Sequence, residues 1–291
     1  MEMIAQAATR AGPQCIVLTD EVYKYIIHSS IEESDTSDEH HTRKQSQQTG
    51  NNISCPNPGH VHFATLPGMW ERTITISSAG KTFSATGWQV GWCIGPKHLV
   101  TPIHQLLPYV QFCASTVIQE ALARSLPRAD EPYEGYSSYY HYLKATYTRK
   151  RDLLVKALKS AGFGVPNYDI SAGGGFFIFA RIGKRVANCI PPERLMTFNT
   201  AAPGNVVRQD WALCQWLVEE KGVLCIPSGP FFSTERAVRG DSDHFIRIAF
   251  CKTDDTIDVA AEALMSMIDE DTTRAKVTNS VHRIPIVAKL S

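Results

Sequence analysis

Short apolar runs alternate with helix-forming segments along most of the chain, and this alternation restricts the possible folds more than any other feature. The run CIVLTD at residues 15–20 ends in an acid, which is typical of a buried parallel strand. Further strands are expected at 73–76, 90–94, 173–182, 223–229 and 244–250. Helices are expected at the N-terminus up to Gly12, at 115–126, from Pro132 to about Ala161, at 209–221 and at 255–270. The pattern predicts an α/β chain with a second α+β region at its C-terminal end.

The order of these elements predicts two domains and a tail. Residues 1–135 would form a first domain built on a parallel sheet, and residues 136–270 would form a long helix and a second, α+β domain. Residues 271–291 show no clear period and are expected to be a loosely held tail. A polar tract at about 29–59 has almost no large apolar residues, so it cannot offset its ordering entropy. We expect it to be a disordered insertion.

Several potential metal ligands lie in or beside this tract. They are His40, His41, Cys55, His60 and His62. Their spacings match no standard zinc pattern, and we therefore expect no metal site. The chain has eight cysteines, which are scattered and never form C-x-x-C, so we expect reduced thiols rather than a disulfide framework.

The composition argues against several classes of partner. Hydrophobic residues make up 43% of the chain and charged residues 20%, as in ordinary globular proteins. Lysine plus arginine equals aspartate plus glutamate at 29 each, so there is no electrostatic case for nucleic acid or an anionic membrane. No apolar run approaches the ~18 residues of a membrane span. We expect a cytoplasmic protein, with the mitochondrion as the alternative.

Three features could supply one chemical site. Asp20 and Tyr23 belong to the sequence DEVY at the carboxyl end of a predicted strand, where open α/β sheets bind ligands. Ser78 and Lys81 lie among small residues directly after the strand at 73–76. Arg247 lies at the end of an apolar strand, where a buried guanidinium would need an anion. Each residue alone also has a structural interpretation, as a helix cap, a loop lysine or a salt-bridge arginine. Together they form a set suited to pyridoxal phosphate chemistry.

Three segments carry a resemblance to a known family. DEVYKY, SSAGKTFSATGWQVGWCIGP and HFIRIAFCK closely resemble the class I, fold type I pyridoxal-phosphate aminotransferases. LPGMWERT, just before the lysine strand, favours the branch of kynurenine aminotransferases, which also act as glutamine transaminases and cysteine-S-conjugate β-lyases. The resemblance implies transfer of an amino group between an L-amino acid and a 2-oxo acid. It also implies the C-terminal part of the large parallel-sheet domain and a smaller α+β domain.

The resemblance assigns a role to each candidate residue. Lys81 would form the Schiff base with pyridoxal phosphate and move the substrate Cα proton. Asp20 would pair with the pyridine nitrogen, Tyr23 with the ring 3-oxygen, and Ser78 with the phosphate. Arg247 would bind the substrate α-carboxylate as a bidentate fork.

Two further residues and a partner subunit follow from the same resemblance. Phe112 would be an aromatic residue that the partner subunit contributes near the substrate pocket, which implies a homodimer. Gln89 stands where the family usually has a phosphate-binding Lys or Arg. Glutamine donates a hydrogen bond without a charge, so phosphate binding should weaken by about 1–2 kcal/mol.

The chain also begins where the middle of such an enzyme is expected. The preceding part of family members supplies half of the large sheet, an aromatic residue that stacks on the cofactor and an asparagine. Two alternatives therefore stay open beside the aminotransferase. One is a catalytically incomplete, N-terminally truncated form of such an enzyme, whose sheet would expose edges and apolar faces. The other is a related lyase or synthase on the same fold.

Overall fold

The computed structural model of the chain describes residues 1–28, 59–165, 173–195 and 208–281, and the side chains as far as residue 267. The chain divides into two compact units. Unit 1 comprises Met1–Thr148 with Asp169–Gly175, and unit 2 comprises Arg149–Tyr168 with Phe176–Ser291. The sequence-based domain boundary at 135/136 stays a prediction. The polar tract expected at about 29–59 lies, apart from Gly59, outside the described residues.

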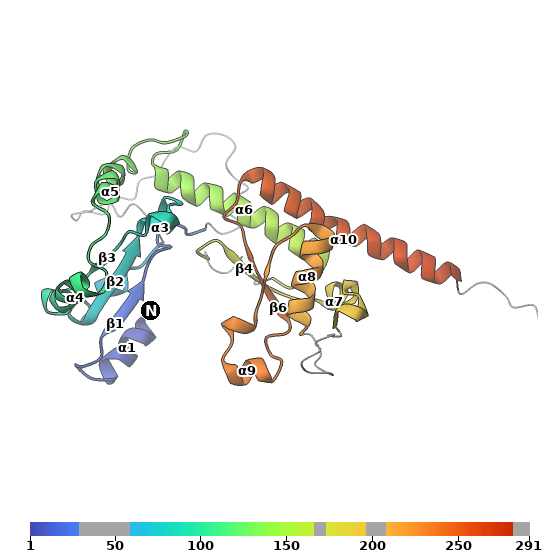
Figure 1. The fold of residues 1–291 in the computed structure, drawn as a ribbon, viewed down its shortest axis with the longest axis horizontal. Helices are drawn as coiled ribbons and strands as arrows, with labels where there is room; N and C mark the ends of the chain where they lie inside the picture. The colour runs from blue at the N-terminus through green and yellow to red at the C-terminus, as the bar shows by residue number, and fades with distance from the viewer. Residues whose placement is uncertain (29–58, 166–172, 196–207, 282–291) are drawn as a thin grey trace, which may run out of the picture. The chain divides into compact units, whose positions relative to one another are not determined.

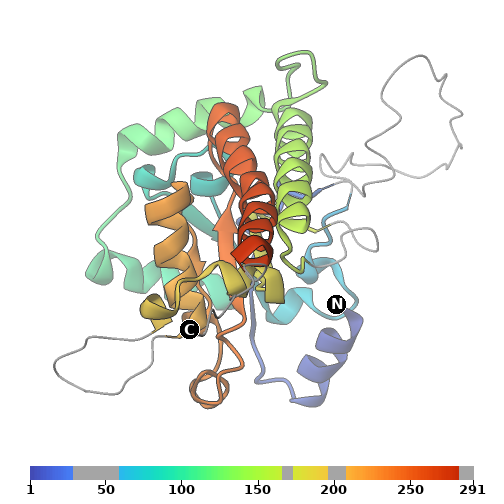
Figure 2. The ribbon, with the colours of Figure 1, turned by 90° about the vertical axis from the view of Figure 1, so that its right-hand side faces the viewer.

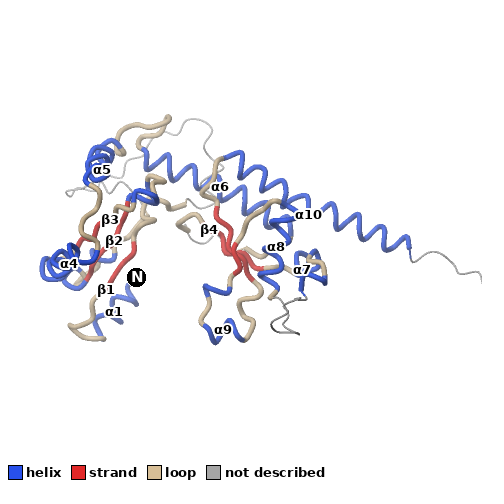
Figure 3. The backbone as a smooth tube through the Cα atoms, viewed as in Figure 1, coloured by secondary structure: helices blue, strands red, loops and turns tan. Residues whose placement is uncertain are grey.

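Unit 1 is built on a three-stranded sheet in the order β1-β2-β3 (Figures 1 and 3). β1 (Val17–Asp20) runs parallel to β2 (Thr73–Ser78), and β3 (Gly91–Ile94) runs antiparallel to β2. The register places Asp20 opposite Ile76 and Ser78 opposite Gly91. The carboxyl ends of β1 and β2 therefore share one edge of the sheet, as the sequence pattern predicted.

Helices and 3-10 turns flank the sheet of unit 1, and some of them bury small apolar clusters against it. They are α1 (Glu2–Arg10), α3 (Ala79–Thr82), α4 (Lys97–Val110) and α5 (Thr116–Arg128), with 3-10 turns η1 (Phe63–Thr65), η2 (Trp70–Arg72) and η3 (Thr86–Trp88). One cluster centres on Ala8, Phe63 and Met69. The other centres on Ala79, Val90 and Leu122. These two clusters position the turns on either side of the sheet edge.

Part of the sheet stays exposed. In the described part of the chain, β1 and β3 are the outer strands of the sheet. Leu18 on β1 is 65% exposed and Ile94 on β3 is 51% exposed. Aliphatic residues in strands usually pack against another layer. Both aliphatic side chains therefore lie uncovered on the outer strands of this sheet.

α6 (Tyr139–Ala161) starts later than the sequence predicted. The prediction began the helix at Pro132, but Glu134 and Gly135 have positive φ angles of 50° and 81°. Tyr133 and Tyr136 form a bridge across this turn, so the backbone cannot be helical there. The predicted end is confirmed, because Gly162 follows Ala161 with φ of 98°. The helix buries a stripe of apolar side chains, namely Leu143, Tyr147, Leu154 and Leu158.

Unit 2 is a small antiparallel sheet with helices. β4 (Phe177–Arg181), β6 (Phe245–Ala249) and β5 (Ile226–Pro227) lie in the order β4-β6-β5. α8 (Gln209–Lys221) packs along β5 and β6 (Figure 2). The remaining elements are α7 (Lys184–Cys189), η4 (Pro192–Leu195), η5 (Gly229–Phe231), α9 (Thr234–Val238) and α10 (Asp254–Val281). The sequence predicted α8 correctly. It was wrong to end the last helix at 270, because α10 continues to Val281.

The core of unit 2 is aliphatic. Its fully buried side chains are Ile178 on β4, Ile246 on β6, and Leu213 and Leu217 on α8. Burial of such side chains contributes roughly 1.5–3 kcal/mol each, so this layer holds β6 in place. None of the described helices combines the length and apolar character that a membrane span requires.

Candidate active site

Lys81 lies in the short turn of helix that follows β2 (Figure 1). Ser78 is the N-cap of this helix and has an extended backbone, with no hydrogen bond from its side chain to the helix. The turn is anchored at its start, because the Ala79 amide donates to the Val90 carbonyl at 3.1 Å. A Cβ on Gly80 would lie 3.4 Å from the Thr86 Cα and 3.6 Å from the Ser78 Oγ. The small residues therefore let η3 pack closely on the lysine turn.

Asp20 and Tyr23 follow the neighbouring strand. Asp20 ends β1 and is exposed, and its Oδ1 accepts a hydrogen bond from the Val22 amide at 3.2 Å. The next amide, that of Glu21, donates to the Ile76 carbonyl at 2.8 Å and ties this end of β1 to β2. Tyr23 is half-buried in the turn that follows. The structure thus brings Asp20, Ser78 and Lys81 to one edge of the sheet.

Gln89 and Phe112 occupy strained backbone positions in unit 1. Gln89 has φ of 54°, and its Nε2 donates to the Thr86 carbonyl at 2.8 Å, so the amide stabilises its own turn. Phe112 has φ of 69° directly after α4, and its side chain is 81% exposed. Positive φ costs of the order of 1–3 kcal/mol in residues other than glycine.

Arg247 lies on β6 in unit 2. Its guanidinium carbon is 4.3 Å from the ring centre of Phe177 and 4.4 Å from that of Phe231. Cation–π contacts use the faces of the guanidinium, whereas its N–H donors lie in the plane. Arg247 also borders a largely apolar cavity of about 550 Å³ together with residues of α8, β5 and α10. The sequence did not reveal that two aromatic rings would contact this side chain.

Sequence reasoning missed a polar cluster beside Asp20. The carboxylate of Glu21 is buried and contacts the His60 Nε2 at 3.1 Å and the His62 Nδ1. Burial alone would raise the pKa of Glu21, but hydrogen bonds from His60 and His62 and their charge outweigh it and lower the pKa. The sequence pointed to both histidines as potential metal ligands. It did not point to Glu21, which lies within the segment DEVY.

A second missed residue supports the lysine turn from outside. The Tyr139 hydroxyl donates to the carbonyl of Thr82, the residue after Lys81, at 2.8 Å. Its ring stacks on Phe83 at a centroid distance of 5.5 Å. Burial, and then the neighbouring tyrosines, raise the pKa of Tyr139 to about 12, so the phenol stays a neutral donor at ordinary pH.

Replacing Tyr139 by phenylalanine is expected to lower the free energy of unfolding by about 1 kcal/mol, because one hydrogen bond is lost while the ring stacking stays. Urea denaturation would measure the change. Tyr136→Phe is the matched control, since Tyr136 lies in the preceding turn and is 41% exposed. Equal effects of the two substitutions would show that the bond to Thr82 contributes nothing.

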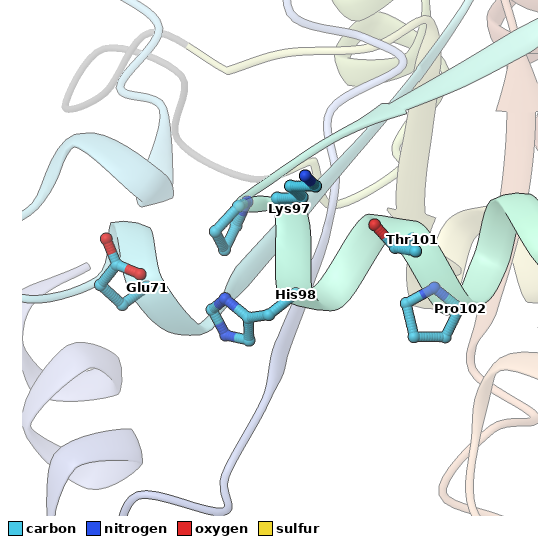
Figure 4. Close-up of a pocket in the computed structure, with 6 residues that line it drawn as sticks. Glu71, Lys97, His98, Thr101 and Pro102 are labelled. Atoms are coloured by element: carbon cyan, nitrogen blue, oxygen red, sulfur yellow. The ribbon is translucent and has the colours of Figure 1, made fainter.

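Figure 4 shows a hollow whose lining residues flank Ser78, Lys81 and Gln89 in the sequence. It has a volume of about 630 Å³ and is lined by Glu71, Pro96, Lys97, His98, Thr101 and Pro102. Glu71 comes from η2, Pro96 is the N-cap of α4, and the other lining residues lie in the first turns of α4 (Figure 4). None of the predicted site residues lines it, and the hollow carries no part of the proposed chemistry.

Comparison with known proteins defines the class of the chain. Residues 2–264 match the family model of aminotransferase class I and II. The chain is 33% identical over 267 residues to the kynurenine–oxoglutarate transaminase of Dictyostelium discoideum, covering 92% of this chain and 52% of the relative. It is 31% identical to human kynurenine–oxoglutarate transaminase 3, over 91% of this chain and 48% of that protein. The chain spans about half the length of the curated relatives it matches.

Solved structures agree on the fold. The N-succinyldiaminopimelate aminotransferase from Mycobacterium tuberculosis superimposes with a TM-score of 0.62 at 27% identity, covering 91% of this chain and 52% of that chain. The fold is the α/β fold type I of these enzymes, as the sequence predicted. The chain belongs to the class I and II aminotransferases. Its curated relatives include the kynurenine–oxoglutarate transaminases, which confirms the predicted branch.

Proposed function

We propose that the protein catalyses pyridoxal-phosphate-dependent transamination between an L-amino acid of the kynurenine or glutamine type and a 2-oxo acid. The observation that carries the proposal is the lysine turn after β2, at the edge where Asp20 ends the parallel neighbour strand. The family match over residues 2–264 supports it, as do the names of the relatives. β-Elimination from cysteine S-conjugates is proposed as a side activity of the same site.

The donor set at this edge fits pyridoxal phosphate. It offers an amine, a carboxylate, a hydroxyl and a phenol on Lys81, Asp20, Ser78 and Tyr23. The Ser78 hydroxyl makes no capping bond to α3, which leaves it available to a phosphate oxygen. When bound, the cofactor supplies an electron-withdrawing ring that stabilises negative charge at the substrate Cα.

Each residue has a task that its chemistry can perform. Lys81 would hold the cofactor through Nζ and then, as a free amine, take the Cα proton and return it. The Asp20 carboxylate would keep the ring nitrogen protonated, and the Tyr23 hydroxyl would donate to the ring oxygen. Arg247 would bind the substrate α-carboxylate with its in-plane N–H donors. The exposed Phe112 would act in a homodimer, in the site of the partner subunit.

The test is cofactor retention followed by turnover. The purified chain would be incubated with pyridoxal phosphate, freed of excess, and examined by absorbance. A retained long-wavelength band, and amino transfer from kynurenine or glutamine to a 2-oxo acid, are the expected results. Turnover of the amino acid without any need for a 2-oxo acid would favour a related lyase or synthase instead.

A second candidate is a chain that keeps the residues but not the activity. The exposed Leu18 and Ile94 on the outer strands support it, because a sheet with uncovered aliphatic residues lacks packing that a rigid site needs. In that case no cofactor would be retained at any concentration tested, although the chain would still be folded by circular dichroism.

Gln89→Arg is expected to tighten cofactor binding by about 1–2 kcal/mol, roughly 5–30-fold, because a charged donor replaces a neutral amide near the proposed phosphate position. The measurement is a fluorescence titration with pyridoxal phosphate. Pyridoxal, which has no phosphate, is the control ligand and should bind both proteins equally. A gain for pyridoxal as well would mean that residue 89 acts through its backbone strain and not through phosphate.

A further inference from the structure

We propose that Glu21, His60 and His62 bind a divalent transition-metal ion, with Zn²⁺ as the best-suited species. All three residues belong to unit 1, and none takes part in the proposed transamination. Two imidazoles and one carboxylate are a ligand set typical of zinc sites that keep a water molecule in the fourth position.

The donor atoms already converge. The Nε2 of His60, the Nδ1 of His62 and a carboxylate oxygen of Glu21 all lie within 4.8 Å of one another. His60 Nε2 is 3.1 Å from Glu21 Oε2, the same oxygen that His62 Nδ1 contacts. Ligand atoms around a tetrahedral zinc ion lie roughly 3.3 Å apart. Small side-chain rotations are therefore enough to open a position between the three atoms.

The burial of the three side chains also suits an ion. The Glu21 side chain is 5% exposed, and its ionic partners in the described part of the chain are these two histidines. A buried carboxylate is stabilised by a nearby positive charge, which a bound cation supplies. The side chains of His60 and His62 are 20% and 33% exposed, so an ion and its water could enter from their side.

The surrounding backbone holds the ligands in place. The Phe63 amide donates to Glu21 Oε1 at 3.4 Å and orients the carboxylate. The Thr65 hydroxyl donates to the His62 carbonyl at 2.7 Å and fixes the start of η1. Such outer hydrogen bonds orient metal ligands in known sites. A bound ion would thus fasten the segment before η1 to the end of β1, next to Asp20.

The sequence-based expectation of no metal rested on the histidines and Cys55 of the polar tract and did not include Glu21. That residue lies 39 positions before His60, so no short spacing motif reveals the set. The fold alone brings it together.

The test is calorimetric titration of the whole chain with ZnCl₂ after removal of metals with a chelator. We expect one ion per chain, with a rise in Tm when zinc is in excess. His60→Gln and His62→Gln keep a hydrogen-bond donor toward Glu21 but lose the imidazole. Each should weaken binding by more than the roughly 10–100-fold typical of an outer partner. His104→Gln, on the exposed face of α4, is the matched control and should bind as the parent does.

Titration with Co²⁺ gives a second readout, since intense visible bands report tetrahedral coordination. Absence of zinc binding by the parent chain would overturn the proposal and leave the three residues as a hydrogen-bonded cluster. Unchanged binding in His60→Gln and His62→Gln would equally overturn it, because the ion would then lie elsewhere. Both readouts are independent of transaminase activity, so the metal site and the proposed function can fail separately.

Discussion

Lys81→Ala is expected to remove both the absorbance band of lysine-bound pyridoxal phosphate and all measurable transamination. The substitution deletes the Nζ atom that would hold the cofactor and move the Cα proton. Proton transfer by a positioned side chain contributes about 10²–10⁴-fold to a rate, and the loss of the covalent attachment adds to this. The effect should therefore exceed that of any other single substitution in the site.

Two control variants separate the chemistry of Lys81 from its charge. Lys97→Ala removes an exposed lysine at the start of α4 and should leave the band and the rate unchanged. Lys81→Arg keeps a positive charge in the α3 turn but provides no nucleophilic amine, so it should behave as Lys81→Ala does. A band that persists in Lys81→Ala would mean that another lysine holds the cofactor and would refute the assignment.

The sequence predicted the sheet edge well because local patterns determine it. β-branched runs mark β1 and β2, and the small residues around Lys81 mark the turn between strand and helix. Resemblance then assigned chemistry to residues that lie close in sequence to these strands. The positions of Asp20, Ser78 and Lys81 follow from parallel pairing, which any α/β pattern of this kind implies.

Other features depend on contacts that a local pattern does not contain. α4 lay outside the predicted helices, and Pro102 and Pro108 lie inside it, where proline ordinarily breaks a helix. α6 begins late because of two positive φ angles that composition does not reveal. The aromatic neighbours of Arg247 come from β4 and η5, far apart in the chain. These are consequences of tertiary packing, which overrides local preference.

The buried carboxylate of Asp210 links several segments of unit 2. It is fully buried at the start of α8. Its Oδ2 accepts from the Ser228 amide at 2.9 Å, the Gly229 amide at 3.2 Å and the Arg208 Nη2 at 3.0 Å. One side chain thus ties α8 to the turn after β5, and β5 pairs with β6 beside Arg247. This role could not be predicted from the sequence, because an acid in the first turn of a helix is common on dipole grounds alone.

Asp210→Ala is expected to lower the free energy of unfolding by about 3–5 kcal/mol, because the two amides and the guanidinium would lose a charged acceptor inside the protein. Urea denaturation measures the loss, and hydrogen exchange locates it, since the Ser228 and Gly229 amides should lose protection first. Asp258→Ala, on the exposed side of α10, is the control and should change stability by less than about 0.5 kcal/mol. The loss of stability in Asp210→Asn should fall between those of the two alanine variants. The asparagine side chain keeps one oxygen acceptor, but its NH₂ group places a donor next to the backbone amide donors. If Asp210→Ala proved as stable as the Asp258→Ala control, water must replace the carboxylate, and the link between α8 and β5 would rest on apolar packing alone.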